Sequence, residues 1–182
     1  MSSGIWSLEI AERRHKCDYF LAMAILTYFG MPKSIADLGC GTGLYCRFFK
    51  TMGCQDVRGY EGTIGVRDLG IYDNIMTLDL TVPLVQKRYD LVLCLEVGEH
   101  ISRDKEQSFI DNVCNFVNKN LVLSWAVEGQ YSASGHVNCR NNDYIISEFT
   151  RRGLKLNKKL TRGLRDAAVL KYFKDTLMVF KC

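Results

Sequence analysis

Short apolar runs alternate along the chain with segments in which apolar residues recur every three or four positions. Five runs have the length and flanking turn residues of strands, and they occupy residues 34–39, 56–61, 74–80, 89–96 and 120–128. The first, fourth and fifth runs are almost continuously apolar, as strands covered on both faces of a sheet must be. This pattern favours a parallel sheet.

Helical spacing is present between the strands, in residues 44–53 and 102–119. Ser102 is a good N-cap for the second of these helices, and Lys119 lies near its end, where the helix dipole favours a cation. The apolar stretch 19–31 is shorter than the roughly 20 residues of a membrane span, so it is expected to be a core helix. Alternating strands and helices predict a doubly wound α/β fold that binds ligands at the carboxyl ends of its strands.

The pattern changes after the fifth strand. The stretch 141–153 is expected to be a helix that ends at Gly153. Two further strands are expected at 154–160 and 175–182, and no clear helical pattern separates them. These last two strands could therefore pair antiparallel.

The length of 182 residues fits a single domain. Its expected parts are an N-terminal helical segment (1–33), a cofactor-binding core (34–128), and a C-terminal helix with antiparallel strands (129–182). The first residues lack an apolar signal core with a small-residue cleavage site, and no apolar stretch reaches membrane length. A cytoplasmic protein without a membrane partner is therefore expected.

Composition excludes a disordered or fibrous chain, because 47% of the residues are hydrophobic and 24% are charged. The eight cysteines contain no C-x-x-C pair and mostly lie within apolar patterns. Free buried thiols are therefore expected, rather than disulfides or structural zinc.

The net charge of +4 conceals a basic stretch, residues 151–165, that contains seven basic residues and no acidic one. The seven are Arg151, Arg152, Lys155, Lys158, Lys159, Arg162 and Arg165. A solvated strand edge, where lysines discourage edge-to-edge pairing, is the favoured interpretation. Attraction of an anionic substrate is the alternative.

The sequence ADLGCGTG, residues 36–43, joins the first strand to a helix through Gly39, Gly41 and Gly43. Glycines at these positions let the chain turn tightly and let a ligand approach the backbone closely. A dinucleotide fingerprint has another small residue at the position of Leu44, so a nicotinamide cofactor is disfavoured.

Acidic residues surround this glycine loop in the predicted fold. Glu61 ends the second strand, where a carboxylate can accept both hydroxyls of a ribose. Asp79 and Leu80 end the third strand, where they can meet the edge of an adenine, and Asp37 lies within the glycine motif itself. Such a run of acids suits a cationic ligand better than a pyrophosphate.

Taken together, ADLGCGTG, Glu61, Asp79 and YDLVLCLEVGEHI resemble the successive motifs of class I S-adenosylmethionine-dependent methyltransferases, over about residues 34–128. The resemblance implies a Rossmann-like, mostly parallel seven-stranded sheet with an antiparallel C-terminal strand pair and helices on both faces. It also implies S-adenosylmethionine as cofactor. The implied contacts are Asp37, Gly39, Gly41 and Gly43 with the methionine part, Glu61 with the ribose, Asp79 and Leu80 with the adenine, and Glu96 near the sulfonium.

A second motif, EVGEH, places Glu96, Glu99 and His100 where the fourth strand gives way to a loop. Two carboxylates and an imidazole can hold a divalent metal, and this donor set suits Mn²⁺, Fe²⁺, Co²⁺ or Zn²⁺ and, less comfortably, Mg²⁺. His136, after the fifth strand, is the candidate fourth ligand, because the loops after strands four and five are neighbours in this topology.

The motif resembles the E-x-x-E-H subset of the same superfamily, namely small-RNA 3′-terminal ribose methyltransferases and, more loosely, ubiquinone-pathway O-methyltransferases. This resemblance implies that Glu96, Glu99, His100 and His136 bind the metal, with Glu99 and the two histidines at the catalytic centre. The segment around His136 matches the RNA enzymes only loosely. The alternative is a metal-free enzyme in which His100 packs or positions the loop.

The function predicted is metal-assisted O-methylation of a hydroxyl on a sugar unit, in a glycan or nucleotide sugar. Two alternatives stay open: 2′-O-methylation of an RNA end, and a cofactor-binding module without catalysis. Trp6 and Trp125 could stack on a sugar or base, although Trp125 could equally belong to the core. His15, among charged residues, is expected to be solvated.

Overall fold

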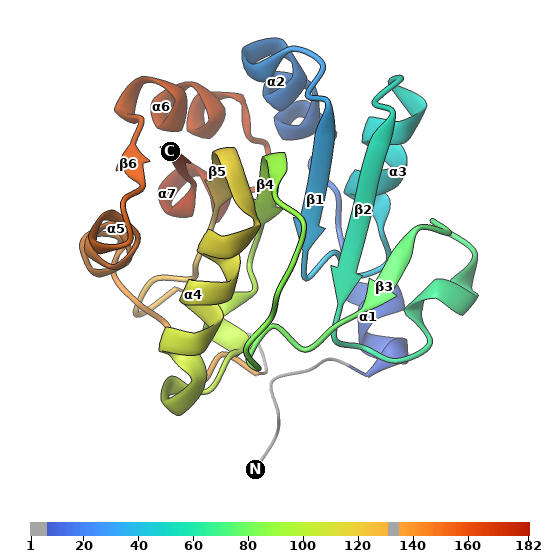
Figure 1. The fold of residues 1–182 in the computed structure, drawn as a ribbon, viewed down its shortest axis with the longest axis horizontal. Helices are drawn as coiled ribbons and strands as arrows, with labels where there is room; N and C mark the ends of the chain where they lie inside the picture. The colour runs from blue at the N-terminus through green and yellow to red at the C-terminus, as the bar shows by residue number, and fades with distance from the viewer. Residues whose placement is uncertain (1–6, 131–134) are drawn as a thin grey trace.

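The computed structural model describes residues 7–130 and 135–182, and in this part of the chain seven strands form one sheet. The strands are β1 (Ser34–Leu38), β2 (Asp56–Glu61), β3 (Ile75–Thr77), β4 (Tyr89–Cys94), β5 (Val117–Leu123), β6 (Lys155–Leu156) and β7 (Met178–Lys181). Their order across the sheet is β3-β2-β1-β4-β5-β7-β6 (Figure 1).

Six strands of this sheet point the same way, and β7 runs against them. It pairs antiparallel with β5 on one side and with β6 on the other. The predicted α/β class, the mostly parallel seven-stranded sheet and the antiparallel C-terminal pair are therefore confirmed. The sequence did not show that β7 inserts between β5 and β6.

Helices cover both faces of the sheet (Figure 1). They are α1 (Leu8–Arg14), α2 (Tyr19–Phe29), α3 (Leu44–Thr51), α4 (Glu106–Phe116), α5 (Asn142–Arg151), α6 (Lys158–Ala167) and α7 (Phe173–Thr176), with the short 3-10 helices η1 (Val66–Leu69), η2 (Gly98–His100) and η3 (Arg103–Lys105). One core layer lies between the sheet and α2, α3, α6 and α7. The other lies between the sheet and α4 and α5.

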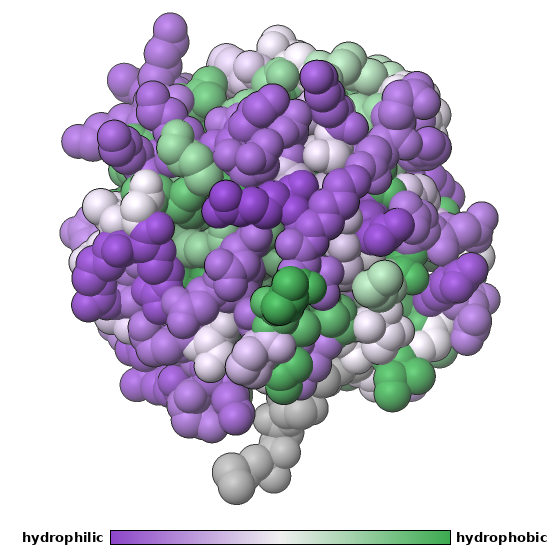
Figure 2. All heavy atoms as spheres, in the orientation of Figure 1, coloured by the Kyte–Doolittle hydropathy of each residue, from purple (hydrophilic) through white to green (hydrophobic). Residues whose placement is uncertain are grey.

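The two layers follow from the alternation of side chains along each strand. In β1, Ile35 belongs to the first layer and Ala36 to the second, and in β4 Leu91 and Val92 divide in the same way. Because both faces are covered, these strands need apolar residues at nearly every position. On the face in Figure 2 hydrophilic residues predominate, so the apolar side chains are mostly turned inward.

The prediction of a strand over residues 154–160 is largely wrong. Only Lys155 and Leu156 form β6, and the chain then enters α6, where the side chain of Asn157 accepts a hydrogen bond from the Leu160 amide. This helix buries only Thr161 and Leu164, so its apolar stripe is too sparse to show in the sequence. The basic stretch is therefore mostly helical, and only its Lys155 lies on an edge strand.

Several predicted boundaries also differ. The strand 74–80 shrinks to β3, and Asp79 lies in the loop after it. β5 begins at Val117 rather than at residue 120, and it ends at Leu123. Ser102 precedes η3 instead of starting α4, and its side chain makes no capping hydrogen bond to the helix backbone.

Two further expectations are corrected in part. α2 is not enclosed in the core, because the side chain of Phe20 is 70% exposed while Leu21 is fully buried. All eight cysteines are free, as expected, but only four are buried and Cys182 is exposed. No helix in the described part of the chain has the length and apolar character that crossing a membrane requires.

Asp18 ties the start of α2 to the C-terminal part of the chain. Its Oδ1 accepts from the Leu21 amide, 3.0 Å away, and caps α2. Its Oδ2 accepts from the amides of Val169 and Leu170, at 2.7 and 2.8 Å. The side chain is buried, so no water replaces these bonds. Asp18 thereby fastens the segment that leads into α7.

Replacing Asp18 with alanine should lower the free energy of unfolding by about 3 kcal/mol, because the substitution removes a helix cap and leaves two further amides without an acceptor. Urea denaturation of the two proteins measures this difference. The control is Glu9→Ala, which removes an exposed acid and should change stability by less than about 0.5 kcal/mol. Equal effects of the two substitutions would contradict the anchoring role.

Candidate functional site

A cavity of about 360 Å³ lies where β1, β2 and β4 end. Eight residues proposed from the sequence line it, namely Asp37, Gly39, Gly41, Glu61, Asp79, Leu80, Glu96 and His100. Gly43, Glu99 and His136 are not in its wall. The cavity therefore brings together most of the residues that the sequence motifs indicated, although they come from four separate stretches of chain.

The three glycines of the loop all have left-handed backbone conformations, with φ of 71° at Gly39, 51° at Gly41 and 80° at Gly43. A Cβ would lie 2.4 Å from Val97 Cγ2 at Gly39, and 2.8 Å from His15 Cγ at Gly41. The protein's own side chains thus fill the space that a Cβ would need. The glycines are required for backbone conformation and close packing as well as for any ligand.

Glu61 closes the glycine loop from the neighbouring strand. Its Oε2 accepts from the Gly41 amide at 2.8 Å, and its Oε1 accepts from the Thr63 amide at 2.9 Å. The carboxylate is therefore held in one orientation at the cavity wall, and each oxygen retains a further lone pair for a ligand.

Asp79 is oriented by a local turn. One of its oxygens, Oδ1, accepts from both the amide and the hydroxyl of Thr81, at 2.8 and 2.7 Å. The carbonyl of the adjacent Leu80 accepts from Asn112 Nδ2 at 2.8 Å, which ties this loop to α4. Both residues therefore reach the cavity from a loop whose position is set by hydrogen bonds.

Asp37 is the most buried acid of the cavity wall, at 3% exposure. Burial and, to a smaller extent, the nearby Glu61 raise its pKa to about 7, against a weak hydrogen bond from the thiol of Cys46 at 3.7 Å. A buried carboxyl with so high a pKa is one whose charge lacks compensation. A cation bound in the cavity would supply this compensating charge.

His15 is not solvated, contrary to the expectation from the sequence. Its Nδ1 accepts from the Thr42 amide at 3.1 Å and lies 2.8 Å from the Thr42 hydroxyl. Burial lowers its pKa to about 4, so the ring is neutral near pH 7. The contact brings Arg14 and Lys16 to the cavity as well, and no motif in the sequence indicated this.

The cavity wall also extends beyond the expected cofactor-binding core at its C-terminal side. Tyr172 and Phe173 line it, and their rings are 4.5 Å apart between centroids. The fastening of Val169 and Leu170 to Asp18 holds this segment in place. The sequence showed aromatic residues here but no signal that they face a site.

Glu96 has an unusual backbone. Its φ is 54°, the only positive value at a non-glycine residue within the described ranges. Such a conformation costs about 1–3 kcal/mol and is common at functional sites. It is held by a hydrogen bond from the Glu96 amide to Ser124 Oγ, at 2.8 Å, and by a long bond of 3.4 Å from the Thr176 hydroxyl to the carboxylate.

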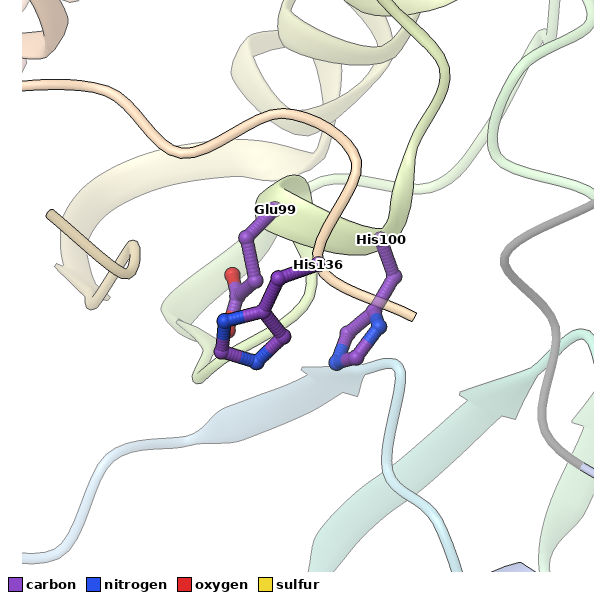
Figure 3. Close-up of side chains that lie close together, drawn as sticks. All are labelled: Glu99, His100 and His136. Carbon is purple, nitrogen blue, oxygen red and sulfur yellow. The ribbon is translucent and has the colours of Figure 1, made fainter. Parts of the chain in front are cut away.

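Three of the four predicted metal ligands converge beside the cavity. Glu99 and His100 lie on η2, and His136 comes from the loop that follows β5 (Figure 3). Each offers a ligand atom within 4.8 Å of the other two. The two imidazole rings are 4.9 Å apart between centroids. Glu96 lies outside this group, and its side chain belongs to the cavity wall instead.

The chemistry of this group fits a divalent cation. Glu99 is fully buried, and neither carboxylate oxygen makes a well-formed hydrogen bond among the described residues, although the Glu96 carboxyl lies near enough to raise its pKa. His100 donates from Nδ1 to the Gly135 carbonyl at 3.0 Å, which places the lone pair on Nε2. A metal-binding histidine is commonly oriented in this way by its second nitrogen.

The pKa values of these acids and imidazoles also fit a site for a divalent cation. Burial raises the pKa of Glu99 well above its usual range, and the neighbouring Glu96 raises it further. Burial also raises the pKa of Glu96. Burial and the adjacent His136 lower the pKa of His100 to about 4. The imidazoles are therefore neutral near pH 7, as metal ligands must be, and the acids lack a compensating cation.

Trp125 belongs to the core, so one of the two interpretations of this residue is confirmed. It is fully buried, and its ring packs so closely on Gly98 that a Cβ there would lie 2.3 Å from it. Its Nε1 donates to the Asn138 carbonyl at 2.6 Å. Trp6 lies outside the described residues.

None of the seven residues of the basic stretch is in the wall of the cavity. Arg151 and Arg152 pair with Glu148, and Arg152 also pairs with Asp111. The cations that do line the cavity are Arg14, Lys16 and Lys105. Any attraction of an anionic substrate to the cavity itself would therefore rest on different residues from those that the sequence suggested.

No known protein-family profile matches the chain, and no curated protein matches it in sequence. Solved structures do match. CalS10 from Micromonospora echinaspora, an amino pentose methyltransferase of calicheamicin biosynthesis solved with bound S-adenosylmethionine, matches with a TM-score of 0.69 and 15% identity, over 95% of each chain.

Two other structures are similar. NodS from Bradyrhizobium japonicum, an N-methyltransferase in complex with S-adenosylhomocysteine, matches with a TM-score of 0.67 and 14% identity, over 90% of this chain and 84% of its own. The methyltransferase domain of bacterial CtHen1 matches with a TM-score of 0.64 and 15% identity, over 90% and 96%. The chain therefore has the Rossmann-like methyltransferase fold.

The contact between His15 and Thr42 generates a pH prediction. The pKa of His15 is about 4 in the folded protein against 6.5 for the free side chain, so the unfolded chain binds the extra proton between these values. The stability that neutral His15 contributes is present above pH 6.5 and is lost as the pH falls through about 4. The substitution His15→Gln should therefore destabilise the protein more at pH 7 than at pH 5, by about 1–2 kcal/mol.

Urea denaturation of both proteins at the two pH values measures this difference. Glutamine does not titrate, so other groups cancel in the comparison. A destabilisation that is the same at pH 5 and pH 7 would show that His15 is not held neutral by the fold.

Proposed function

We propose that this chain, which has the Rossmann-like methyltransferase fold, is an S-adenosylmethionine-dependent O-methyltransferase that uses a divalent metal to methylate a hydroxyl of a sugar unit, in a glycan or nucleotide sugar. The observation that carries the proposal is the position of His100. This residue lines the cavity and also belongs to the group with Glu99 and His136. A methyl donor and a metal would therefore lie side by side.

The charge of the cavity supports S-adenosylmethionine as the donor. Its sulfonium and amino groups are cationic, and the wall contains Asp37 and Glu96, whose pKa values are both raised by burial. A volume of about 360 Å³ is within the range of small-molecule sites. CalS10 and NodS, which share the fold, were solved with this cofactor or its demethylated product.

The roles proposed for the wall residues are those that the resemblance to class I methyltransferases implies, and the shared position of these residues in the cavity wall supports them. Glu61, with both oxygens already oriented by backbone amides, would bind the ribose hydroxyls. Asp79 and Leu80 would meet the adenine, and Asp37 with the glycine loop would contact the methionine part. We assign Glu96 to the neighbourhood of the sulfonium. Gly43 would support this arrangement without lining the cavity, because it is the N-cap residue of α3 and packs closely against Tyr72.

Glu99, His100 and His136 would hold the metal. Their oxygen and nitrogen donors suit Mn²⁺, Fe²⁺, Co²⁺ or Zn²⁺ and, less well, Mg²⁺. Three protein ligands are typical of catalytic sites, which keep a position for the substrate. A divalent cation held there supplies Lewis acidity that lowers the pKa of an acceptor hydroxyl.

The residues of the chain would perform the remaining work. The cavity wall would hold the methyl donor in a fixed orientation toward the acceptor, and alignment of this kind contributes several kcal/mol to catalysis. The oxygen forms a bond to the methyl carbon, and the carbon–sulfur bond breaks with its electron pair going to sulfur. The hydroxyl proton would leave to water, or to His100 or His136 if that imidazole does not bind the metal.

A sugar is favoured over RNA as the acceptor on two grounds. CalS10, which shares the fold over 95% of its length, is an amino pentose methyltransferase. The basic stretch, which was the electrostatic signal for RNA, does not reach the cavity wall. Methylation of a ribose 2′-hydroxyl at an RNA end stays the alternative, supported by the E-x-x-E-H motif and by the similarity to the CtHen1 domain.

Methyl transfer should depend on the metal group. We expect turnover of S-adenosylmethionine with a panel of glycans and nucleotide sugars to fall by at least about 100-fold when a chelator is added, or when Glu99→Gln or His100→Ala removes a ligand. The matched control is Glu148→Gln, which alters a buried acid on α5 and should retain activity. Calorimetry with S-adenosylhomocysteine tests the cofactor site separately.

The outcomes of this experiment separate the alternatives. Turnover that a chelator leaves unchanged would remove the metal but keep the methyltransferase. Cofactor binding without turnover on any acceptor, glycan or RNA, would favour the non-catalytic module. A chain that does not bind S-adenosylhomocysteine would overturn the proposal as a whole.

The basic stretch gives a test of the acceptor. If the acceptor is a sugar, replacing Lys158, Lys159 and Arg162 with alanine should change turnover less than about twofold, and raising the salt concentration should have little effect. If the acceptor is RNA, phosphate contacts make binding fall steeply with salt. Turnover on short RNAs that is lost in the triple variant would therefore reject the glycan assignment.

A further inference from the structure

Glu106 is a buried acid that the proposed reaction does not use. It is the first residue of α4, is 2% exposed, and neither lines the cavity nor belongs to the metal group. Its Oε2 accepts from Asn138 Nδ2 at 2.9 Å and from Arg140 Nε at 2.7 Å. Its Oε1 accepts from the Tyr144 hydroxyl at 2.5 Å. Gln107 Nε2 adds a longer bond to Oε1 at 3.4 Å. A buried carboxylate with this many donors is a firm attachment point.

This attachment keeps Glu106 ionised. Burial alone would raise the pKa of its carboxyl, but hydrogen bonds from Tyr144, Arg140 and Asn138 outweigh it and lower the pKa below its usual value. Glu106 and Arg140 therefore form an ion pair that is shielded from solvent, since the Arg140 side chain is 22% exposed. Removing one member of such a pair leaves an uncompensated charge.

Two of the donors to Glu106 belong to the segment that carries His136. Asn138, two residues along, is fully buried and is fixed on three sides. Its amide donates to the Glu99 carbonyl at 2.9 Å, its carbonyl accepts from Trp125 Nε1, and its side chain donates to Glu106. One residue thus joins the backbone of Glu99 to the carboxylate of Glu106.

Neighbouring bonds complete the attachment. The amide of Val137, next to His136, also donates to the Glu99 carbonyl at 2.9 Å. The amide of Arg140 donates to the Ala126 carbonyl at 3.0 Å. The distance between Glu99 and His136 is therefore set by a chain of buried hydrogen bonds that ends at Glu106.

We infer that Glu106 is a positioning residue for the metal site: it holds the segment from Gly135 to Arg140 against η2, and so sets the geometry in which His136 meets Glu99 and His100. This inference rests on the metal site of the proposed function. It explains why an acid and an amide side chain are buried, and an arginine is half-buried, where no ligand would touch them. Residues that orient metal ligands typically contribute 10- to 100-fold to metal affinity.

The experiment is a calorimetric titration of the purified full chain with Co²⁺, whose visible absorption also reports the ligand geometry. For Glu106→Gln we expect Co²⁺ affinity to fall 10- to 100-fold and the absorption bands to shift, while affinity for S-adenosylhomocysteine stays within about twofold. The matched control is Glu148→Gln, an equally buried acid that pairs with Arg151 and Arg152 away from the site. It should leave Co²⁺ affinity unchanged even if it destabilises the fold.

A second variant guards against a Glu106 substitution that fails to fold. Asn138→Ala keeps the Glu106–Arg140 ion pair and removes only the amide link, so it should produce the same loss of Co²⁺ affinity. Unchanged Co²⁺ affinity in the folded variants would overturn the inference, and so would equal losses in Glu106→Gln and Glu148→Gln. If the parent protein binds no Co²⁺, the metal site itself fails, and the inference fails with it. The methyl-donor site would stand, because S-adenosylhomocysteine binding tests it separately.

Discussion

Uncompensated negative charge, buried at the carboxyl edge of the sheet, is the constraint on which the rest of the site depends. Asp37 at the end of β1, and Glu96 and Glu99 just after β4, all have pKa values raised by burial. A buried carboxylate is costly unless it is paired. Two cationic ligands, a sulfonium in the cavity and a metal beside it, would satisfy all three acids, and His100 both lines the cavity and belongs to the group with Glu99 and His136.

The fold holds these acids in place from three directions. The glycine loop is packed from outside by His15 and Val97, and bonded from the next strand by Glu61. Asp18 fixes the segment that carries Tyr172 and Phe173 into the cavity. On the other side, Glu106 and Asn138 hold the loop of His136. These attachments consist of packing contacts and of buried or half-buried hydrogen bonds within the protein itself, so none of them requires a ligand.

The central strands were predictable because they are covered on both faces, and such strands require continuous apolar runs. β1 and β4 lie where the continuously apolar runs 34–39 and 89–96 indicated, and β2 lies where the run 56–61, recognised by its length and flanking turn residues, indicated. α6 was missed because only Thr161 and Leu164 are buried on it, so a helix on the rim of the sheet looks like a charged strand edge. The place of β7 between β5 and β6 depends on pairing across the sheet, which carries no local signal.

The residues of the site also divide into those that the sequence indicated and those that only the structure revealed. The sequence by itself determined which residue types stand at the strand ends, because glycines, acids and the EVGEH motif are local features with local causes. Only the tertiary structure decided which of them meet. It placed the side chain of Glu96 in the cavity wall, apart from the group that contains His136. It also placed His15 against the glycine loop and Glu106 against the segment that carries His136. The contacts that form the site join residues as far apart as Asp18 and Leu170, which are 152 positions apart in the chain, and their geometry arises from packing. No pattern of neighbouring residues specifies it.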